Sequence, residues 1–148
     1  MVCAVIIAHS FIGRKLVATA EYIVGKIKGL TAVSIDCKTS AFKARKAIAR
    51  AINEVGQGDG VLLLTDLFGG APSNIAFSFL NKEKIEVVTG VNLPMIITFW
   101  NKRKDKNLEE LAKLVQLSGI RNIVMASDLM EEKGVLGKRI VKSNRRLS

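Results

Sequence analysis

The chain has 148 residues, of which 49% are hydrophobic and 24% charged, and these values fit one soluble globular domain with its own core. No apolar run reaches the roughly 18 residues of a membrane-spanning helix, and no basic residue precedes the apolar N-terminal segment as it does in a secretory signal. Two cysteines, Cys3 and Cys37, are too few for a disulfide framework. We therefore expect a cytoplasmic protein with reduced cysteines.

The formal net charge of +10 raises nucleic acid or an acidic surface as a partner. Most basic residues are scattered over the predicted helices, and a denser group stands between Lys133 and Ser148. Six Phe, one Tyr and one Trp leave few rings for base stacking, and no nucleic-acid-binding motif is present. The pattern favours a solvated basic surface, with one domain over 1–130 and a basic tail over 131–148.

Near-continuous apolar runs alternate with segments of helical period, as in a parallel sheet covered on both faces. The predicted strands are residues 2–8, 31–36, 61–65, 85–91 and 121–126. The predicted helices cover 13–30, about 44–55, 72–80, a short segment that begins after Asn92, and 108–119. The chain is therefore predicted to be an α/β domain with an open parallel sheet, for which we consider the strand order 2-1-3-4.

Two reactive side chains follow strands of this predicted sheet: His9 after the first and Asp66 after the third. Ligands of open α/β sheets bind at the carboxyl ends of the strands, where the strand order reverses. In the order 2-1-3-4, the first and third strands are neighbours about 4.8 Å apart, so these side chains are expected to touch. A carboxylate on one ring nitrogen fixes the tautomer and leaves a lone pair on the other nitrogen, which suits a nucleophile.

Each of these residues also has a structural alternative, since a lone histidine is often a packing residue and Asp66 can be an ordinary turn carboxylate. Other chemistries find less support. His9 is the only histidine, which excludes a multi-histidine metal site, and no P-loop, G-x-G-x-x-G, G-x-S-x-G or C-x-x-C motif occurs. Phosphoryl transfer through histidine remains, and we expect neither a cofactor nor a metal.

A glycine pair after the third strand predicts a phosphate-binding loop. Gly69–Gly70 lets the backbone pass close to a ligand, and Pro72 fits the first turn of the next helix. Ala71 is the predicted N-cap and has no side-chain oxygen to bind the free helix amides. The amides of Ser73 and Asn74 are therefore expected to be available to a phosphate oxygen.

Three segments of the chain resemble the enzyme IIA domain of the mannose family, which belongs to the phosphoenolpyruvate-dependent sugar phosphotransferase system. They are Ile6–Ser10, Leu64–Asn74 and Gly90–Met95. They occur in the family's order, and the resemblance runs from residue 1 to about 130. Together they are specific, although each alone is a weak signal.

This resemblance implies that His9 accepts a phosphoryl group from the phosphocarrier HPr and passes it to an enzyme IIB, with Asp66 hydrogen-bonded to His9. It implies phosphate contacts from Ser10 and the loop 69–74. It also implies a 2-1-3-4 sheet with helices on both faces, and a homodimer in which a C-terminal strand, about 121–126, adds antiparallel to the partner's sheet. The membrane is reached only indirectly, through IIC and IID subunits.

The chain departs from the family pattern at three places. Ala71 stands where the family often has Ser, so the missing hydroxyl contact to phosphate must come from the backbone or Ser10. No IIB domain follows, and the basic tail differs from the usual linker. Two roles stay open: a carrier that serves a sugar transporter, and a regulatory phosphoprotein whose phosphorylation state controls partner binding. The sugar is not predictable, because a IIA does not touch it.

Overall fold

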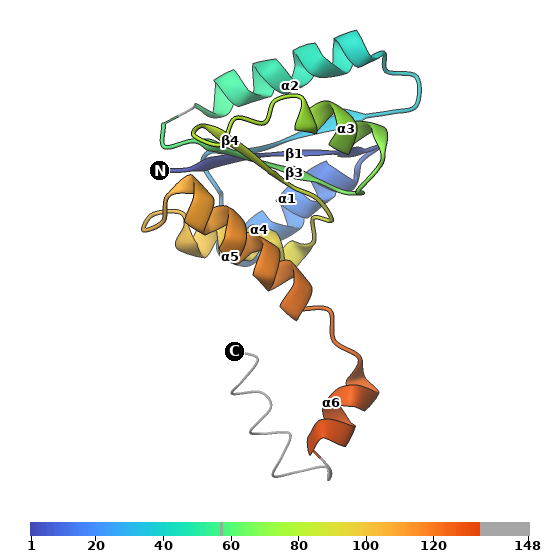
Figure 1. Cartoon of the computed structure of the whole chain (residues 1–148), viewed down its shortest axis with the longest axis vertical. Coiled ribbons are helices and arrows are strands. Elements are labelled where there is room, and N and C mark those ends of the chain that lie inside the picture. The colour runs from blue at the N-terminus through green and yellow to red at the C-terminus, as the bar shows by residue number, and fades with distance from the viewer. Residues whose placement is uncertain (57, 134–148) are drawn as a thin grey trace.

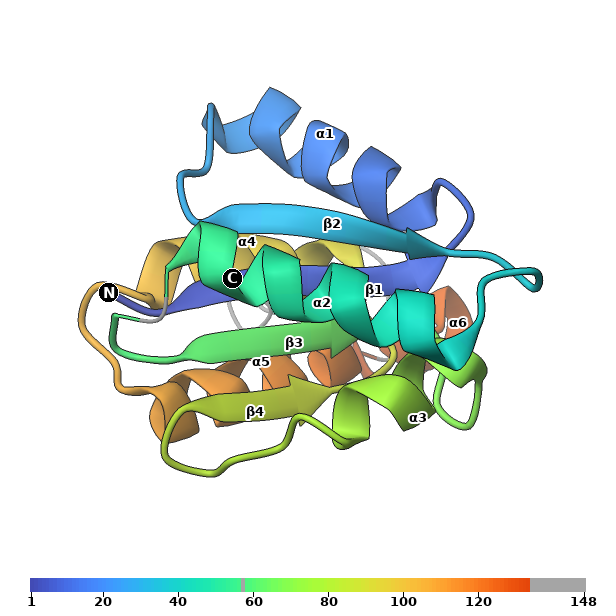
Figure 2. The same ribbon diagram turned by 90° about the horizontal axis from the view of Figure 1, so that it is seen from above.

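A four-stranded parallel sheet of order β2-β1-β3-β4 forms the centre of the molecule (Figures 1 and 2). The computed structural model describes residues 1–56 and 58–133. Its strands are β1 (Cys3–His9), β2 (Leu30–Ile35), β3 (Val61–Thr65) and β4 (Ile85–Val88). The predicted strand order is confirmed, and it reverses between β1 and β3, where ligands of such sheets bind.

Helices cover both faces of this sheet. One face is covered by α1 (Ile12–Val24), α4 (Leu93–Lys102) and α5 (Leu108–Arg121). The other face is covered by α2 (Ala41–Val55) and α3 (Ala71–Phe77). Alternate residues of β3 enter the two cores: Leu62 and Leu64 lie in the first, and Val61 and Leu63 in the second. Burial on both faces explains why β1 and β3 are almost continuous apolar runs.

Side-chain caps begin three of the helices. Ser40 accepts a hydrogen bond from the Lys43 amide at the start of α2, at 3.2 Å. The side chains of Asn92 and Asn107 do the same for α4 and α5. Each cap satisfies a backbone N–H that the helix itself leaves free, and the predicted capping role of Asn92 is confirmed.

The first helix is shorter than predicted, because it ends at Val24 and not at residue 30. Gly25 follows with φ of 89°, a conformation that glycine adopts without a steric penalty. The next turn is held by the Glu21 carboxylate, which accepts a hydrogen bond from the Ile27 amide at 2.9 Å. Ile27 is buried in the same core as α1, so the apolar spacing continues past the end of the helix.

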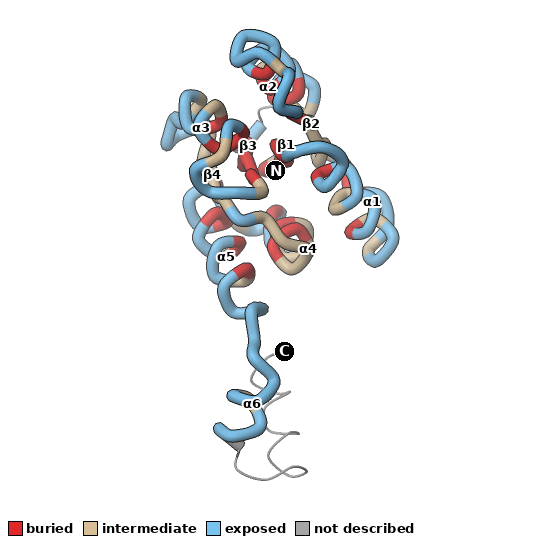
Figure 3. The backbone as a smooth tube through the Cα atoms, turned by 90° about the vertical axis from the view of Figure 1, so that its right-hand side faces the viewer, coloured by how far each residue is buried: buried red, intermediate tan, exposed pale blue. Residues whose placement is uncertain are grey.

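The predicted fifth strand is wrong for the single chain. Arg121 is the last residue of α5, residues 122–125 pair with no strand in the described part of the chain, and α6 (Ala126–Lys133) follows. We name residues 122–133 the C-terminal arm; Figures 1 and 3 show that it stands clear of the body and is almost fully exposed. A strand needs a neighbouring backbone, so the predicted exchange between two copies needs a second chain and stays a prediction.

Most of the predicted basic tail, residues 134–148, lies outside the described residues, and the division of the chain at residue 130 stays a prediction. In the part that the structure does describe, every helix is too short or too polar to cross a membrane. The remaining departures are small. The fourth strand ends at Val88 and not at residue 91, and α3 ends at Phe77.

Candidate functional site

His9 and Asp66 meet at the carboxyl end of the sheet, between β1 and β3. One carboxylate oxygen, Oδ2 of Asp66, accepts a hydrogen bond from the His9 backbone amide at 2.8 Å and lies 2.9 Å from the ring Nδ1. An ionised carboxylate can only accept, so Nδ1 carries the proton and Nε2 of the neutral ring keeps its lone pair. The contact predicted from the strand order is confirmed.

The two side chains differ in their exposure to solvent. The His9 side chain is 46% exposed and that of Asp66 is 12% exposed, so the ring can reach another molecule while the carboxylate stays within the sheet edge. The second oxygen of Asp66, Oδ1, is buried and has no hydrogen-bond partner among the described residues. In residues 1–56 and 58–133, the acidic, Cys and His side chains form no group of three that could hold a metal ion.

The loop after Asp66 differs in one detail from its prediction. Gly70 is the N-cap of α3, and Ala71 is the first helical residue. The backbone of Gly70 is extended, with φ of −83° and ψ of 171°, and its carbonyl accepts a hydrogen bond from the Asn74 amide at 3.1 Å. The Asn74 amide is therefore not available to a ligand, contrary to the prediction, because Gly70 begins the helix one residue early.

Ser73 closes this loop with its side chain. The buried hydroxyl accepts a hydrogen bond from the Gly69 amide at 3.0 Å and donates one to the Gly70 carbonyl at 2.9 Å. Gly69 itself has φ of 90°, in the left-handed region that favours glycine. The backbone amides of Gly70, Ala71 and Ser73 donate to no acceptor within the described chain, so these three remain free to bind an anion.

Gly70 lies against the imidazole, and Ser10 directly follows His9 in the chain. A Cβ atom on Gly70 would lie 3.3 Å from Cε1 of His9, which shows how closely the loop backbone passes the ring. Ser10 is exposed and has φ of 51°, and its amide donates to the Ile35 carbonyl at 3.3 Å. His9, Asp66 and Gly70 thus come together, whereas the hydroxyl of Ser73 is occupied within the loop.

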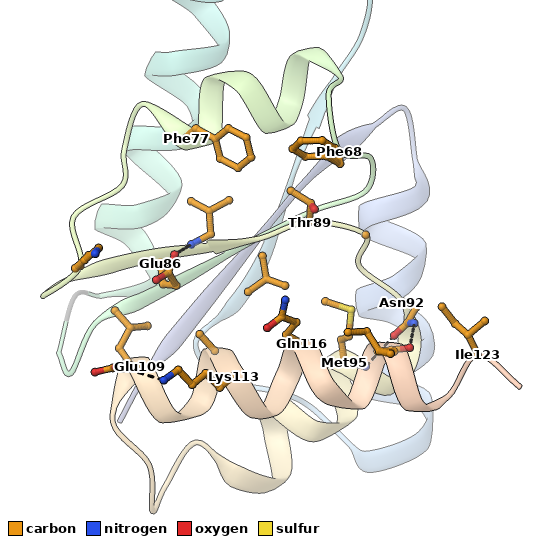
Figure 4. A pocket seen from close by; sticks show the side chains of 18 residues that line it. Phe68, Phe77, Glu86, Thr89, Asn92, Met95, Glu109, Lys113, Gln116 and Ile123 are labelled. Atoms are coloured by element: carbon orange, nitrogen blue, oxygen red, sulfur yellow. Dashed lines mark hydrogen bonds and ion pairs between the residues drawn. The ribbon is translucent and has the colours of Figure 1, made fainter.

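A groove of about 770 Å³ beside β4 was not expected from the sequence. Figure 4 shows Phe68 and Phe77 on one side of it and Gln116 of α5 on the other. In the described part of the chain, Asn81 forms an isolated antiparallel bridge with Ile85, and no strand of the sheet pairs with the outer edge of β4. This edge is one wall of the groove. The one sign of this groove in the sequence is Phe68, a large aromatic residue that directly precedes the glycine pair 69–70.

Known proteins share this fold and sequence pattern. Residues 3–116 match the model of the EIIA-man family, which is described as the PTS system fructose IIA component. The mannose-specific EIIAB component of Escherichia coli K12 is 29% identical over 122 residues, which cover 80% of this chain and 38% of that protein. The fructose-specific EIIA component of Bacillus subtilis is 24% identical over 133 residues, which cover 89% of this chain and 91% of that protein.

A solved structure agrees with these matches. The crystal structure of the phosphotransferase system component EIIA from Streptococcus agalactiae has a TM-score of 0.78 at 26% identity, over 86% of this chain and 99% of that one. The family match includes β1, β3 and the loop between Asp66 and α3. The chain therefore belongs to the EIIA-man family and is an EIIA component of the sugar phosphotransferase system.

Proposed function

We propose that this chain is a phosphohistidine carrier, which accepts a phosphoryl group from HPr on His9 and passes it to an enzyme IIB in the cytoplasm. The observation that carries the proposal is the 2.9 Å contact between Nδ1 of His9 and Oδ2 of Asp66. It leaves the unprotonated Nε2 as the nucleophile of a half-exposed ring. Membership of the EIIA-man family supports the choice of the two partners.

The proposed transfer step exchanges one N–P bond for another. The lone pair of Nε2 attacks the phosphorus of the HPr phosphohistidine, the N–P bond in HPr breaks, and its electron pair returns to the HPr imidazole. The His9 ring is then positively charged, and the adjacent Asp66 carboxylate stabilises that charge. Transfer to the enzyme IIB repeats the step with His9 as the donor. No net proton is gained or lost.

We further propose that the phosphoryl oxygens bind to Ser10 and to the loop 69–74. Ala71 brings no hydroxyl, so its free backbone amide and that of Gly70 serve as donors. Ser10, the residue after His9, is exposed and adds a hydroxyl. Asn74 contributes through its exposed side chain, since its amide is already bonded to Gly70. Several weak donors around one anion share its charge without a metal or cofactor.

The direct test is the intact mass after incubation with phosphoenolpyruvate, enzyme I and HPr. The expected result is one phosphoryl group that is lost in acid, because phosphohistidine hydrolyses in acid while phosphoserine survives. His9→Ala is expected to fold and to take no label, whereas the control variant Tyr22→Ala, at a ring 91% exposed on α1, keeps it. An acid-stable label, or a label on His9→Ala, overturns the proposal.

We also propose a homodimer in which a C-terminal strand of each copy, about residues 121–126, lies antiparallel along β4 of the other. The arm begins with three exposed apolar residues, Ile123 at 79%, Val124 at 47% and Met125 at 64% exposure, and β-branched residues favour strands. Ile123 and Gly90 line the same groove, so the arm leaves the body near the carboxyl end of β4. An antiparallel strand beside β4 begins at that end.

Sedimentation of two charged variants tests this dimer. Val124→Asp combined with Met125→Asp is expected to be monomeric, because the two carboxylates replace the apolar side chains that pack at the aromatic end of the groove and lose hydration on burial. Ile23→Asp serves as the matched control, since Ile23 is 55% exposed on α1 and lies outside the groove. A dimer in the arm variant, or a monomeric wild-type protein at every concentration, contradicts the proposal.

A further inference from the structure

Phe68 connects the site at His9 with the groove beside β4. It stands two residues after Asp66 and directly before Gly69, and it is 74% exposed. Its ring lines the groove beside Phe77, with the two ring centroids 6.4 Å apart (Figure 4). One short loop therefore carries the carboxylate that contacts His9 and the aromatic ring that forms a wall of the groove.

The middle of this loop is held less firmly than its ends. At one end Asp66 binds His9 twice, and at the other end Ser73 bonds both glycines. Between them Leu67 is 57% exposed and Phe68 is 74% exposed, and the Phe77 ring gives Phe68 an aromatic contact on one side. The opposite face of the Phe68 ring is accessible to a molecule that binds in the groove.

The proposed occupant is the first part of the C-terminal arm of a second copy, residues 122–125. Its apolar side chains match the aromatic end of the groove. Its backbone is placed to pair with the outer edge of β4 beyond Ile85, which is already bridged to Asn81, and it must displace the Glu86 side chain from the Val87 amide. A strand in this place packs against Phe68 and Phe77 and replaces water on the open side of the loop. Burial of exposed rings is favourable because it removes apolar surface from water, and the packed strand therefore resists displacement of the loop.

We infer that Phe68 is a positioning residue: the arm of the second copy packs against Phe68 and thereby holds Asp66 and Gly70 in place around His9. The inference rests on the proposed phosphoryl transfer and on the proposed dimer. It makes each transfer site complete only when a second copy covers the groove beside it. Loss of this contact displaces the loop rather than removing a reacting group, and small displacements of positioning groups are costly for transfer.

A double-mutant cycle tests this link, because coupled residues give effects that do not add. The four proteins are the wild type, Phe68→Ala, the arm variant with Val124→Asp and Met125→Asp, and the combination. The measurement is the single-turnover rate of His9 phosphorylation by phosphorylated HPr. Each change alone is expected to lower the rate about tenfold, and the combination is expected to be no slower than the arm variant.

Two further variants separate positioning from other roles. Phe68→Leu keeps an apolar side chain for the arm to pack against, and we expect it to recover most of the wild-type rate. Tyr22→Ala removes a ring that is 91% exposed on α1 and lies outside the groove, and it is expected to leave the rate unchanged. Because Phe68 is exposed in the single chain, its substitution in the monomeric arm variant should leave the thermal unfolding midpoint of that variant unchanged.

The inference and the proposals beneath it fail in different ways. If the two effects multiply, Phe68 acts independently of the arm, for example as a contact for HPr, and the inference is overturned. An unchanged rate in a monomeric arm variant also overturns it. A wild-type protein that stays monomeric removes the dimer and this inference but leaves the label on His9, whereas a wild-type protein without acid-labile label removes the proposed function itself.

Discussion

The two ends of the sheet are built in opposite ways. At the carboxyl end, the His9 ring is half exposed, and Oδ1 of Asp66 has no partner in the described chain. At the amino end, Arg103 is 5% exposed, its Nη1 donates to the Lys28 carbonyl, and its guanidinium lies 5.1 Å from the centre of the Phe99 ring. The carboxyl end leaves the His9 ring accessible to solvent, and the amino end buries the Arg103 guanidinium.

This difference indicates where stability and chemistry lie in the fold. Burial lowers the pKa of Arg103, and the neighbouring Cys3 partly opposes that shift. The buried side chain therefore gives up hydration and depends on its few contacts. His9 keeps its hydration and depends on one carboxylate. Substitutions at the carboxyl end should change phosphoryl transfer without unfolding the protein, and those at the amino end should do the reverse.

The largest expected effect comes from Asp66→Asn. An amide oxygen can still accept a hydrogen bond from Nδ1, but it brings no charge to stabilise the phosphorylated ring, so we expect the rate of His9 phosphorylation to fall roughly a hundredfold. The measurement is rapid-quench transfer from phosphorylated HPr. Asp36→Asn, a carboxylate on the neighbouring loop, is the matched control and should keep the wild-type rate. A wild-type rate in Asp66→Asn would show that Asp66 is only a turn residue.

Arg103→Ala tests the amino end of the sheet, where we expect a change in stability and not in phosphoryl transfer. It removes the packing on Phe99 and leaves the Lys28 carbonyl without its donor, so we expect a loss of about 2 kcal/mol in the free energy of unfolding. Urea unfolding measures this loss. Lys104→Ala is the control, since Lys104 is the exposed neighbour. An Arg103→Ala protein of full stability with impaired transfer contradicts the division between the two ends.

The sequence predicted the part of the site that depends on strand order. Continuous apolar runs identified β1 and β3, and their adjacency placed His9 beside Asp66. It did not predict that Gly70 caps α3, because an extended glycine has no side chain to signal the cap. The apolar spacing also predicted a first helix that is too long, because Ile27 joins the same core after the turn at Gly25.

Features that depend on a distant or second chain segment were beyond the sequence. The run 121–126 has apolar residues suited to a strand, yet nothing in the described chain lies beside it to form one. Phe68 gains its place over the groove from the packing of α3 and α5 around β4, which no local pattern encodes. Local residue patterns thus specify the strands, whereas the groove beside β4 is a product of tertiary packing.

Gly70→Ala tests how closely the loop controls the ring. The backbone of Gly70 has φ of −83°, which alanine also adopts. The new Cβ would lie 3.3 Å from Cε1 of His9, so the ring must shift by a few tenths of an ångström, and we expect the transfer rate to fall about threefold. Gly58→Ala is the matched control, because its Cβ would lie 3.3 Å from the Met1 carbonyl at the amino end. Equal rates in both variants would show that the loop does not constrain His9.

The smallest expected effect concerns Asp36, a fully exposed carboxylate that follows β2 at the carboxyl end. Hydrogen bonds from the Thr39 side chain and the Lys38 amide lower the pKa of Asp36 from its ordinary value of 3.8. The folded pKa therefore lies below the unfolded one, so this carboxylate adds stability that is complete above the unfolded pKa and is lost as the pH falls through the folded pKa.

Urea unfolding of wild type and Asp36→Asn across this acidic range measures the contribution. We expect a small stability difference near neutral pH, because water screens an exposed group, and we expect it to vanish in acid. A difference that grows as the pH falls has the wrong sign and contradicts the hydrogen-bond assignment. Asp36 accepts a hydrogen bond within its own turn and stabilises that turn. Asp66 lies at the same end of the sheet, but its carboxylate contacts the His9 ring. The division between stability and chemistry therefore follows the partner of each carboxylate and not merely its end of the sheet.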